Sequence, residues 1–145
     1  MAEYHKYVFD TGKRKLVGRF EAMYQAEGKR LFDSWHQDDS RQLARRICLD
    51  ILNDYNFSLI LDLGCGKGAF THLLKIKNNE VVGTDISRSA LKIAKARYPD
   101  IQFCQMNLAN RESIRSLVSK KSFDLVVASE VLSYLKNWEN VLTSI

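Results

Sequence analysis

The sequence has little of what would place a chain outside the ordinary globular proteins. It contains one proline and three cysteines, and no apolar run approaches the roughly 18 residues that a membrane span needs. The 46% hydrophobic content is too high for a disordered chain. Residues 1–15 carry several charges and have no apolar core of the signal-peptide kind. We therefore expect a folded cytoplasmic protein with no membrane partner.

The cysteines do not follow a pattern typical of disulfides or metal sites. Cys48, Cys65 and Cys104 are odd in number, and no Cys-x-x-Cys pair occurs. Disulfide frameworks and structural zinc sites need paired or closely spaced thiols. We expect free thiols in a reducing compartment and no bound metal.

The net charge of +5 comes from basic residues spread along the chain. Nucleic-acid-binding proteins normally gather positive charge on one face or along one helix. The dispersed excess is typical of a solvated surface, so nucleic acid is not an expected partner.

The first 56 residues have a helical pattern and are predicted to form an N-terminal helical cap. Apolar residues at 16, 20 and 23/24 predict a helix over 12–27 that ends at Gly28, with a loop to residue 39. A second helix is expected from about Ser40 to Tyr55, capped by Asp39 or Ser40. Four apolar residues spaced by four would form one face of it, namely Leu43, Ile47, Ile51 and Tyr55.

From residue 57 the pattern changes to strands that alternate with helices. Apolar segments predict four strands, at residues 57–63, 80–85, 101–106 and 123–128. Helices are expected over residues 69–76, 87–97, 110–118, 131–135 and 138–145, with Ser87 and Asn110 as caps. This alternation predicts an α/β fold, a doubly wound parallel sheet with helices on both faces. Residues 57–145 would form this core, within a single domain overall.

The segment Leu61–Phe70, LDLGCGKGAF, is the most informative part of the chain. Three of the seven glycines of the chain lie in this segment, at positions 64, 66 and 68, between an expected strand and an expected helix. Glycines permit a tight turn there and let a ligand approach the backbone closely. The segment therefore predicts a ligand-binding loop.

Two carboxylates accompany this turn. Asp85 ends the next expected strand, 21 residues after Gly64, where a carboxylate can accept hydrogen bonds from both hydroxyls of a ribose. Asp62 lies two residues before Gly64, where it would repel a pyrophosphate but suit a ligand that carries an ammonium group. The Gly-x-Gly-x-Gly spacing also departs from the Gly-x-Gly-x-x-Gly of dinucleotide folds. The pattern thus favours S-adenosylmethionine over a nicotinamide cofactor.

Three segments, at residues 61–70, 82–87 and 123–135, together resemble class I S-adenosylmethionine-dependent methyltransferases. The resemblance covers about residues 57–135 and implies a Rossmann-like fold with strand order 3-2-1-4. It implies that Asp62 lies near the methionine ammonium and that Asp85 holds the ribose. It also implies that Gly64, Cys65 and Gly66 line the methionine moiety.

The same resemblance implies roles for residues after the later strands. Ile86 would pack on the adenine. Asn107, followed by Leu108, stands where the family usually has an acidic residue near the adenine amino group, and its amide oxygen can still accept a hydrogen bond. The carbonyl of Ser129 would face the methionine ammonium.

The acceptor side is less defined by sequence. In resembling methyltransferases the helices before the first strand contribute to the acceptor pocket, which makes Trp35 and His36 candidate wall residues, together with Tyr134 after the fourth strand. No catalytic base is assigned. Residues 129–132 lack the Asn/Asp/Ser-Pro-Pro-aromatic segment of enzymes that methylate amino groups of DNA. We expect a small-molecule acceptor, such as a sugar or a natural-product intermediate.

Members of this family usually continue with three more strands after the fourth, whereas this sequence ends at Ile145. We expect an incomplete core whose fourth strand has an uncovered edge, which invites homodimer formation through that edge or the last helix. The activity of the 145-residue form stays open. A non-catalytic S-adenosylmethionine-binding module and an NAD-dependent oxidoreductase are the alternatives.

Overall fold

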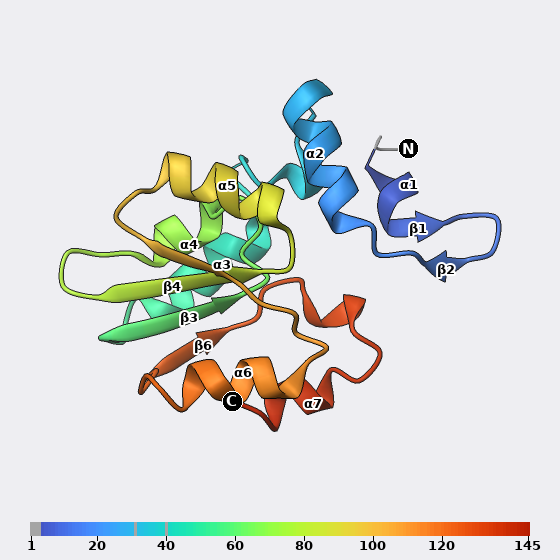
Figure 1. Ribbon diagram of the computed structural model, residues 1–145. Coiled ribbons are helices and arrows are strands. Elements are labelled where there is room, and N and C mark those ends of the chain that lie inside the picture. Colours follow the sequence, from blue (N-terminus) through green and yellow to red (C-terminus); the bar gives the residue numbers. More distant parts are fainter. Residues whose placement is uncertain (1–3, 31, 40) are drawn as a thin grey trace.

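A computed structural model describes residues 4–30, 32–39 and 41–145. Its centre is a sheet of four parallel strands: β3 (Leu59–Leu63), β4 (Glu80–Asp85), β5 (Gln102–Gln105) and β6 (Leu125–Val127). The strand order β5-β4-β3-β6 is the predicted 3-2-1-4 and confirms the doubly wound α/β fold (Figure 1). The first strand, β3, is therefore central, flanked by β4 and β6.

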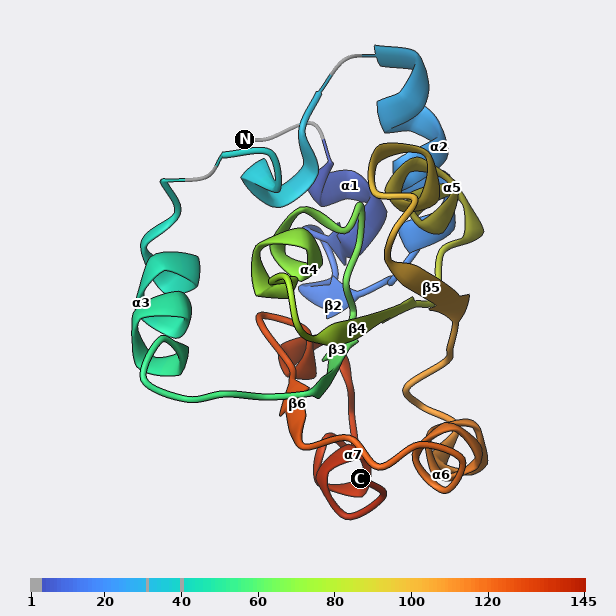
Figure 2. The same cartoon turned by 90° about the vertical axis from the view of Figure 1, so that its left-hand side faces the viewer.

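Successive side chains of β3 pack into two different layers, because strand residues alternate between the faces of a sheet. Leu61 and Leu63 face α6 (Arg111–Val118) and α7 (Glu139–Leu142). Ile60 faces α3 (Leu43–Leu52) and α4 (Ala69–Leu74). Figure 2 shows these two pairs of helices on opposite sides of the sheet, with α5 (Arg88–Arg97) beside β5. Both faces of the sheet are thus covered, which fits its nearly continuous apolar strands.

Helix boundaries in the core follow the sequence closely. The Ser87 hydroxyl accepts a hydrogen bond from the amide of Ala90, and the Asn110 side chain accepts from the amides of Glu112 and Ser113. Both predicted caps are therefore confirmed. The last two expected helices are shorter: residues 131–135 form a 3-10 turn, η2 (Leu132–Tyr134), and residues 138–145 contain only α7. Short helices depend on packing, and α7 buries only Val141.

The N-terminal segment, residues 4–56, differs most from the prediction. The helix expected over 12–27 is wrong in its first half. A short helix, α1 (His5–Val8), leads into a hairpin of β1 (Phe9–Asp10) and β2 (Lys15–Leu16). The Asp10 side chain accepts a hydrogen bond from the amide of Lys13, which favours a turn over a helix. The helix that follows, α2 (Phe20–Arg30), continues through the expected stop at Gly28, and the 3-10 turn η1 (Ser34–His36) interrupts the expected loop.

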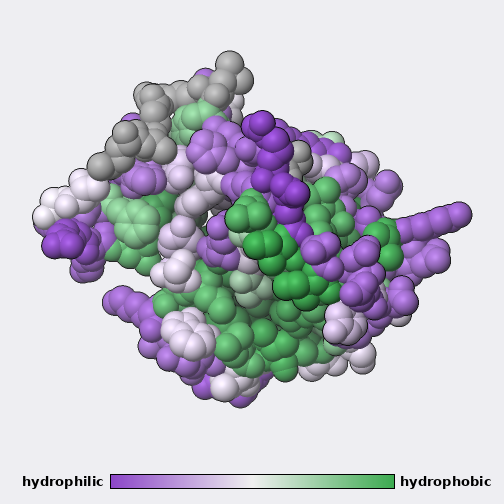
Figure 3. All heavy atoms as spheres, turned by 180° about the vertical axis from the view of Figure 1, so that it is seen from behind, coloured by the Kyte–Doolittle hydropathy of each residue, from purple (hydrophilic) through white to green (hydrophobic). Residues whose placement is uncertain are grey.

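Helix α3 is present, but its cap and orientation differ from expectation. Gln42 occupies the cap position without a capping hydrogen bond, Asp39 accepts from Arg41 instead, and Ser40 lies outside the described residues. The side that faces the core carries Cys48, Leu49 and Leu52. The predicted apolar face is 50–67% exposed, at Leu43, Ile47, Ile51 and Tyr55. Figure 3 shows hydrophobic side chains gathered on the rear face of the molecule.

The part of the N-terminal segment that precedes α3 packs at the carboxyl ends of the strands, with α2 next to α5 (Figure 1). Glu21 of α2 accepts hydrogen bonds from the hydroxyls of Ser87 (2.7 Å) and Ser89 (2.6 Å) at the start of α5. These bonds, that of Ser89 foremost, lower the pKa of Glu21 to about 2. A polar anchor thus fixes α2 beside the sheet.

No helix within the described ranges combines the length and the apolar character that crossing a bilayer demands. The three cysteines are free thiols.

Candidate functional site

A cleft that is open to solvent lies at the carboxyl ends of the parallel strands. Open α/β sheets bind ligands at this edge, near the point where the strand order reverses. The glycine-rich turn, the strand ends and the N-terminal segment all contribute to its walls. Eight of the nine residues predicted to bind the cofactor line it: Asp62, Gly64, Cys65, Asp85, Ile86, Asn107, Leu108 and Ser129.

The glycine-rich turn is pinned to the neighbouring strand. The amides of Gly64 and Cys65 both donate to the carbonyl of Thr84, at 2.7 and 2.8 Å. Gly64 has a left-handed φ of 74°, and a Cβ atom there would lie 2.8 Å from Cβ of Val131. Glycine is required at position 64 because the loop after β6 packs directly against it.

Gly66, the ninth predicted residue, lies beneath the N-terminal segment. Its φ is 55°, and a Cβ atom there would lie 2.7 Å from the hydroxyl of Tyr24. The Gln37 amide group donates to that hydroxyl at 2.8 Å, and its oxygen accepts from the amide of Lys67 at 2.9 Å. At this glycine the close approach is therefore made by the protein's own side chains.

Asp62 is a buried carboxyl group at the end of β3. It is 2% exposed, and it accepts a hydrogen bond from the hydroxyl of Thr71 at 2.6 Å. The pKa of Asp62 is raised to about 7, mainly by burial. The hydrogen bond from Thr71 and the charge of Arg45 oppose this rise, and the charge of Asp85 adds to it. A cationic group in the cleft would restore the ionised form.

Asp85 is held in place by backbone amides. One carboxylate oxygen accepts from Gly66 at 2.9 Å, and the other accepts from Ser87 at 2.8 Å. Burial raises the pKa of Asp85, while these two hydrogen bonds lower it. Each oxygen keeps a lone pair, so the carboxylate is oriented and can still accept hydrogen bonds from a diol.

The far side of the cleft is mostly apolar. Ile86 is 45% exposed there, whereas Met106 and Leu108 are buried. The oxygen of the Asn107 side chain accepts from the amide of Ala109 at 3.0 Å, so the oxygen expected to meet a ligand already has one partner. Ser129 lines the cleft beside Glu130, whose φ of 55° is rare for a residue with a side chain.

Aromatic side chains form the opposite wall. Phe20, Trp35 and Tyr134 all line the cleft, with ring centroids 5.4–6.1 Å apart. The indole nitrogen of Trp35 donates to the hydroxyl of Tyr134 at 2.8 Å. Two of the three residues predicted to form the pocket of the methyl acceptor, Trp35 and Tyr134, are thus brought together. The third, His36, is exposed and is not among the residues that line the cleft.

Four lining residues of the N-terminal segment were not predicted from sequence, namely Phe20, Tyr24, Gln37 and Arg45. Arg45 is 7% exposed and donates to the carbonyl of Gln37 at 2.5 Å. Phe20 and Tyr24 have helical spacing, which predicted a helix but no site. No local motif marks Gln37 or Arg45. Within the described ranges, no group of three or more His, Cys, Asp or Glu residues could hold a metal ion.

Comparison with known proteins agrees with this architecture. A family model described as a methyltransferase domain matches residues 61–145, more than half of the chain. The chain therefore belongs to the methyltransferase-domain family. It is 32% identical over 101 residues to methyltransferase 235L of Invertebrate iridescent virus 6, covering 68% of this chain and 36% of that protein.

It is also 33% identical over 86 residues to trans-aconitate 2-methyltransferase of Methylobacterium radiotolerans, covering 58% of this chain and 31% of the relative. The chain thus spans about a third of the length of the curated relatives it matches.

Solved structures share the fold. A TehB-like S-adenosylmethionine-dependent methyltransferase from Corynebacterium glutamicum has a TM-score of 0.62 at 22% identity, over 85% of this chain and 65% of that one. The plantazolicin methyltransferase BamL, solved with S-adenosylhomocysteine, has a TM-score of 0.60 at 20% identity, over 86% and 52%. Proteins of this family use S-adenosylmethionine.

Proposed function

We propose that this chain binds S-adenosylmethionine and serves in methyl transfer to a small-molecule acceptor. The observation that carries the proposal is the pair of carboxylates, Asp62 and Asp85, that flank the glycine-rich turn inside one cleft. Negative charge there attracts a ligand with ammonium and sulfonium groups and opposes a diphosphate. This pair of carboxylates therefore fits S-adenosylmethionine better than a dinucleotide.

Each part of the cleft has groups suited to one part of this cofactor. Asp85 would accept hydrogen bonds from the ribose hydroxyls, and the apolar side around Ile86, with Leu108 and Asn107, would hold the adenine. Asp62 would attract the methionine ammonium, with Gly64, Cys65, Gly66 and the carbonyl of Ser129 around the methionine. We add Arg45, whose buried guanidinium lies within electrostatic reach of Asp62 and can pair with the carboxylate of the amino-acid end.

S-adenosylmethionine, when bound, supplies a methyl group on a positively charged sulfur. The protein then has to align the acceptor with that methyl group and exclude water. The Cys65 thiol lines the cleft, but burial raises its pKa well above the ordinary value, which keeps it protonated and a poor nucleophile. The side chains thus favour direct transfer to the acceptor, and no catalytic base is assigned.

The aromatic wall supports a small acceptor with a flat or ring-shaped apolar face. The rings of Phe20, Trp35 and Tyr134 offer such a surface beside the proposed methionine end. The names of two similar proteins refer to small substrates, trans-aconitate and plantazolicin. A sugar or a natural-product intermediate fits the same wall.

Calorimetric titration with S-adenosylhomocysteine and with NADH tests the cofactor. We expect binding of the former only, and the reverse would favour an oxidoreductase. Asp85→Ala should weaken S-adenosylhomocysteine roughly 10- to 100-fold, since hydrogen bonds to a charged group are lost. Asp100→Ala, an exposed carboxylate change, serves as control, and equal effects of both variants would refute the ribose assignment.

Methyl transfer to a panel of small acceptors separates an enzyme from a binding module without catalysis. Cofactor binding without turnover for any acceptor would favour the binding module.

We further propose that the protein self-associates through the outer edge of β6 or through α7 and that it works in the cytoplasm. Among the described strands β6 pairs with β3 alone, which leaves its other edge for a partner strand. Free thiols fit a reducing compartment. Light scattering at rising protein concentration should show dimers, and a strictly monomeric species would contradict the association.

A further inference from the structure

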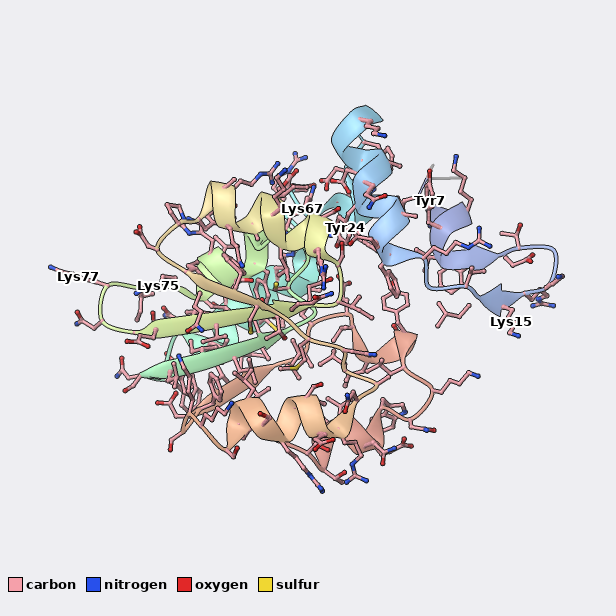
Figure 4. The ribbon with its side chains drawn as sticks, viewed as in Figure 1. Tyr7, Lys15, Tyr24, Lys67, Lys75 and Lys77 are labelled. Carbon is pink, nitrogen blue, oxygen red and sulfur yellow. The ribbon has the colours of Figure 1, made fainter. Side chains whose placement is uncertain are left out.

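We propose that Lys67 is a positioning residue that holds the N-terminal segment closed over the cleft and so couples cofactor binding to the acceptor wall. The inference rests on the proposed function, since it concerns the same cleft. Lys67 belongs to the glycine-rich turn but does not line the cleft, and its side chain is 2% exposed. Figure 4 shows it near Tyr24, between α5 and α2.

The Lys67 ammonium group is surrounded by three carboxylates. It lies 2.5 Å from Glu27, 2.7 Å from Asp33 and 2.9 Å from Asp38. An ammonium group has three donors, so these contacts satisfy it completely. A buried lysine charge is tolerated only with such partners, and we call these four residues the Lys67 cluster.

All three carboxylates come from the N-terminal segment, whereas the lysine comes from the core. Glu27 lies in α2, and the two aspartates flank the 3-10 turn η1. Asp33 also accepts hydrogen bonds from the amides of Gln37 and Asp38, at 3.0 and 2.9 Å. The cluster therefore closes residues 33–38 into a compact loop and fastens that loop to the turn.

The fastened loop carries two side chains of the cleft. Trp35 belongs to the aromatic wall, and Gln37 covers Gly66 through its bonds to Tyr24 and to the Lys67 amide. Trp35 has a left-handed φ of 54°, a conformation that persists only when its surroundings enforce it. Lys67 thus positions both Gln37, which covers the glycine-rich turn, and Trp35, which belongs to the aromatic wall proposed for the methyl acceptor.

Removal of the lysine charge should release the whole loop. Three carboxylates left together in a partly buried space repel one another. Arg97 reaches only Asp38, at 2.6 Å, and this pair is about 40% exposed, so it cannot replace the lysine. The coupling predicts that an effect at position 67 appears both in cofactor affinity and at Trp35.

The experiment uses a Trp138→Phe background, in which Trp35 is the only tryptophan. In that background Lys67→Met should shift the Trp35 emission to longer wavelength and weaken S-adenosylhomocysteine roughly 10-fold or more, within the range of coupling between linked sites. Far-ultraviolet circular dichroism confirms that the variant is folded. Lys77→Met is the matched control, an exposed lysine at the opposite end of the sheet (Figure 4), and should change neither readout.

One further variant keeps the test decisive if Lys67→Met does not fold, and another tests the repulsion between the carboxylates if it does. Asp33→Asn removes one partly exposed charge of the cluster and should give the same two changes at smaller size. Adding Glu27→Gln to Lys67→Met should restore part of the affinity, because it removes one of the repelling carboxylates.

The results separate this inference from the proposed function. Wild-type affinity and unchanged Trp35 emission in folded Lys67→Met or Asp33→Asn would overturn the role of Lys67. Failure of the wild-type protein to bind S-adenosylhomocysteine would overturn the proposed function, while the emission shift would still report on the Lys67 cluster.

Discussion

The indole nitrogen of Trp35 donates a hydrogen bond to the hydroxyl of Tyr134 at 2.8 Å, although the two residues are 99 positions apart. Their ring centroids lie 5.9 Å apart in an edge-to-face arrangement. One partner belongs to the N-terminal segment and the other to the turn after β6, so a single neutral hydrogen bond joins the two halves of the aromatic wall.

Tyr134→Phe removes the acceptor of this bond and keeps the ring. We expect the free energy of unfolding to fall by about 1 kcal/mol, because a half-buried indole N–H loses its partner. The KM for the acceptor should rise while the affinity for S-adenosylhomocysteine stays unchanged. Steady-state kinetics and urea unfolding measure both effects, with Tyr98→Phe, whose ring stacks on His72, as control. A change in the affinity for S-adenosylhomocysteine with an unchanged KM for the acceptor would contradict this prediction and place Tyr134 in the cofactor site.

The carboxyl group of Asp62 should make cofactor binding depend on pH. Its pKa is about 7 in the folded protein, against about 3.9 in an unfolded chain. The folded state therefore binds the proton more tightly between these values, and the stability of the ligand-free protein should fall as pH rises through this window, by up to about 1.4 kcal/mol per pH unit. An ammonium-bearing ligand selects the ionised carboxylate, so affinity should rise up to about pH 7 and binding at pH 6 should release a proton.

Calorimetry at pH 6 in buffers of different ionisation enthalpy measures that proton release. Asp62→Asn keeps an acceptor for Thr71 but cannot titrate. It should therefore abolish the proton release and remove the part of the pH dependence of stability that comes from Asp62, while Glu21 and Asp85 keep theirs. Proton release that persists in Asp62→Asn would assign the titration to another group.

Gly66→Ala should abolish cofactor binding. The added methyl group would lie 2.7 Å from the Tyr24 hydroxyl, at a backbone angle that L-residues rarely adopt. Gly28→Ala is the matched control, because nothing lies within 4 Å of its added Cβ and it sits inside α2. The control should raise the free energy of unfolding by about 0.5–1 kcal/mol. Titration and urea unfolding check the pair, and normal binding by Gly66→Ala would contradict the closed arrangement of Tyr24 and Gln37.

Mutations on the two faces of α3 should differ in their cost to stability. Ile47→Gln changes a half-exposed residue, so the free energy of unfolding should stay within about 0.5 kcal/mol. Leu49→Ala, on the face that packs against the sheet, should cost about 2 kcal/mol or more. Urea unfolding of both variants decides which face is buried, and the reverse order of costs would mean that α3 is rotated.

Prediction from sequence worked best where local signals and tertiary packing agree. The strand β4 coincides with the predicted 80–85, and the caps at Ser87 and Asn110 were recognised because Ser and Asn favour that position intrinsically. The helix predicted from residue 12 fails over residues 12–19. The apolar spacing there is helical, but the turn that Asp10 stabilises leads the chain into β2 instead. Prediction from sequence also missed that the periodic stripe of α3 faces outward, since periodicity marks an apolar face without saying what covers it.

The amino-acid sequence by itself determined the strand–turn–helix core, the glycine-rich turn and the two carboxylates, because each depends on residue types at short spacing. Only the tertiary structure decided that Gln37 reaches this turn, that Trp35 and Arg45 line the same cleft, and that Lys67 turns away from the cleft into three carboxylates. The contacts of Gln37, Lys67 and Trp35 join residues about 30 to 100 positions apart. Such contacts are fixed by packing and charge pairing in three dimensions, which no local pattern encodes.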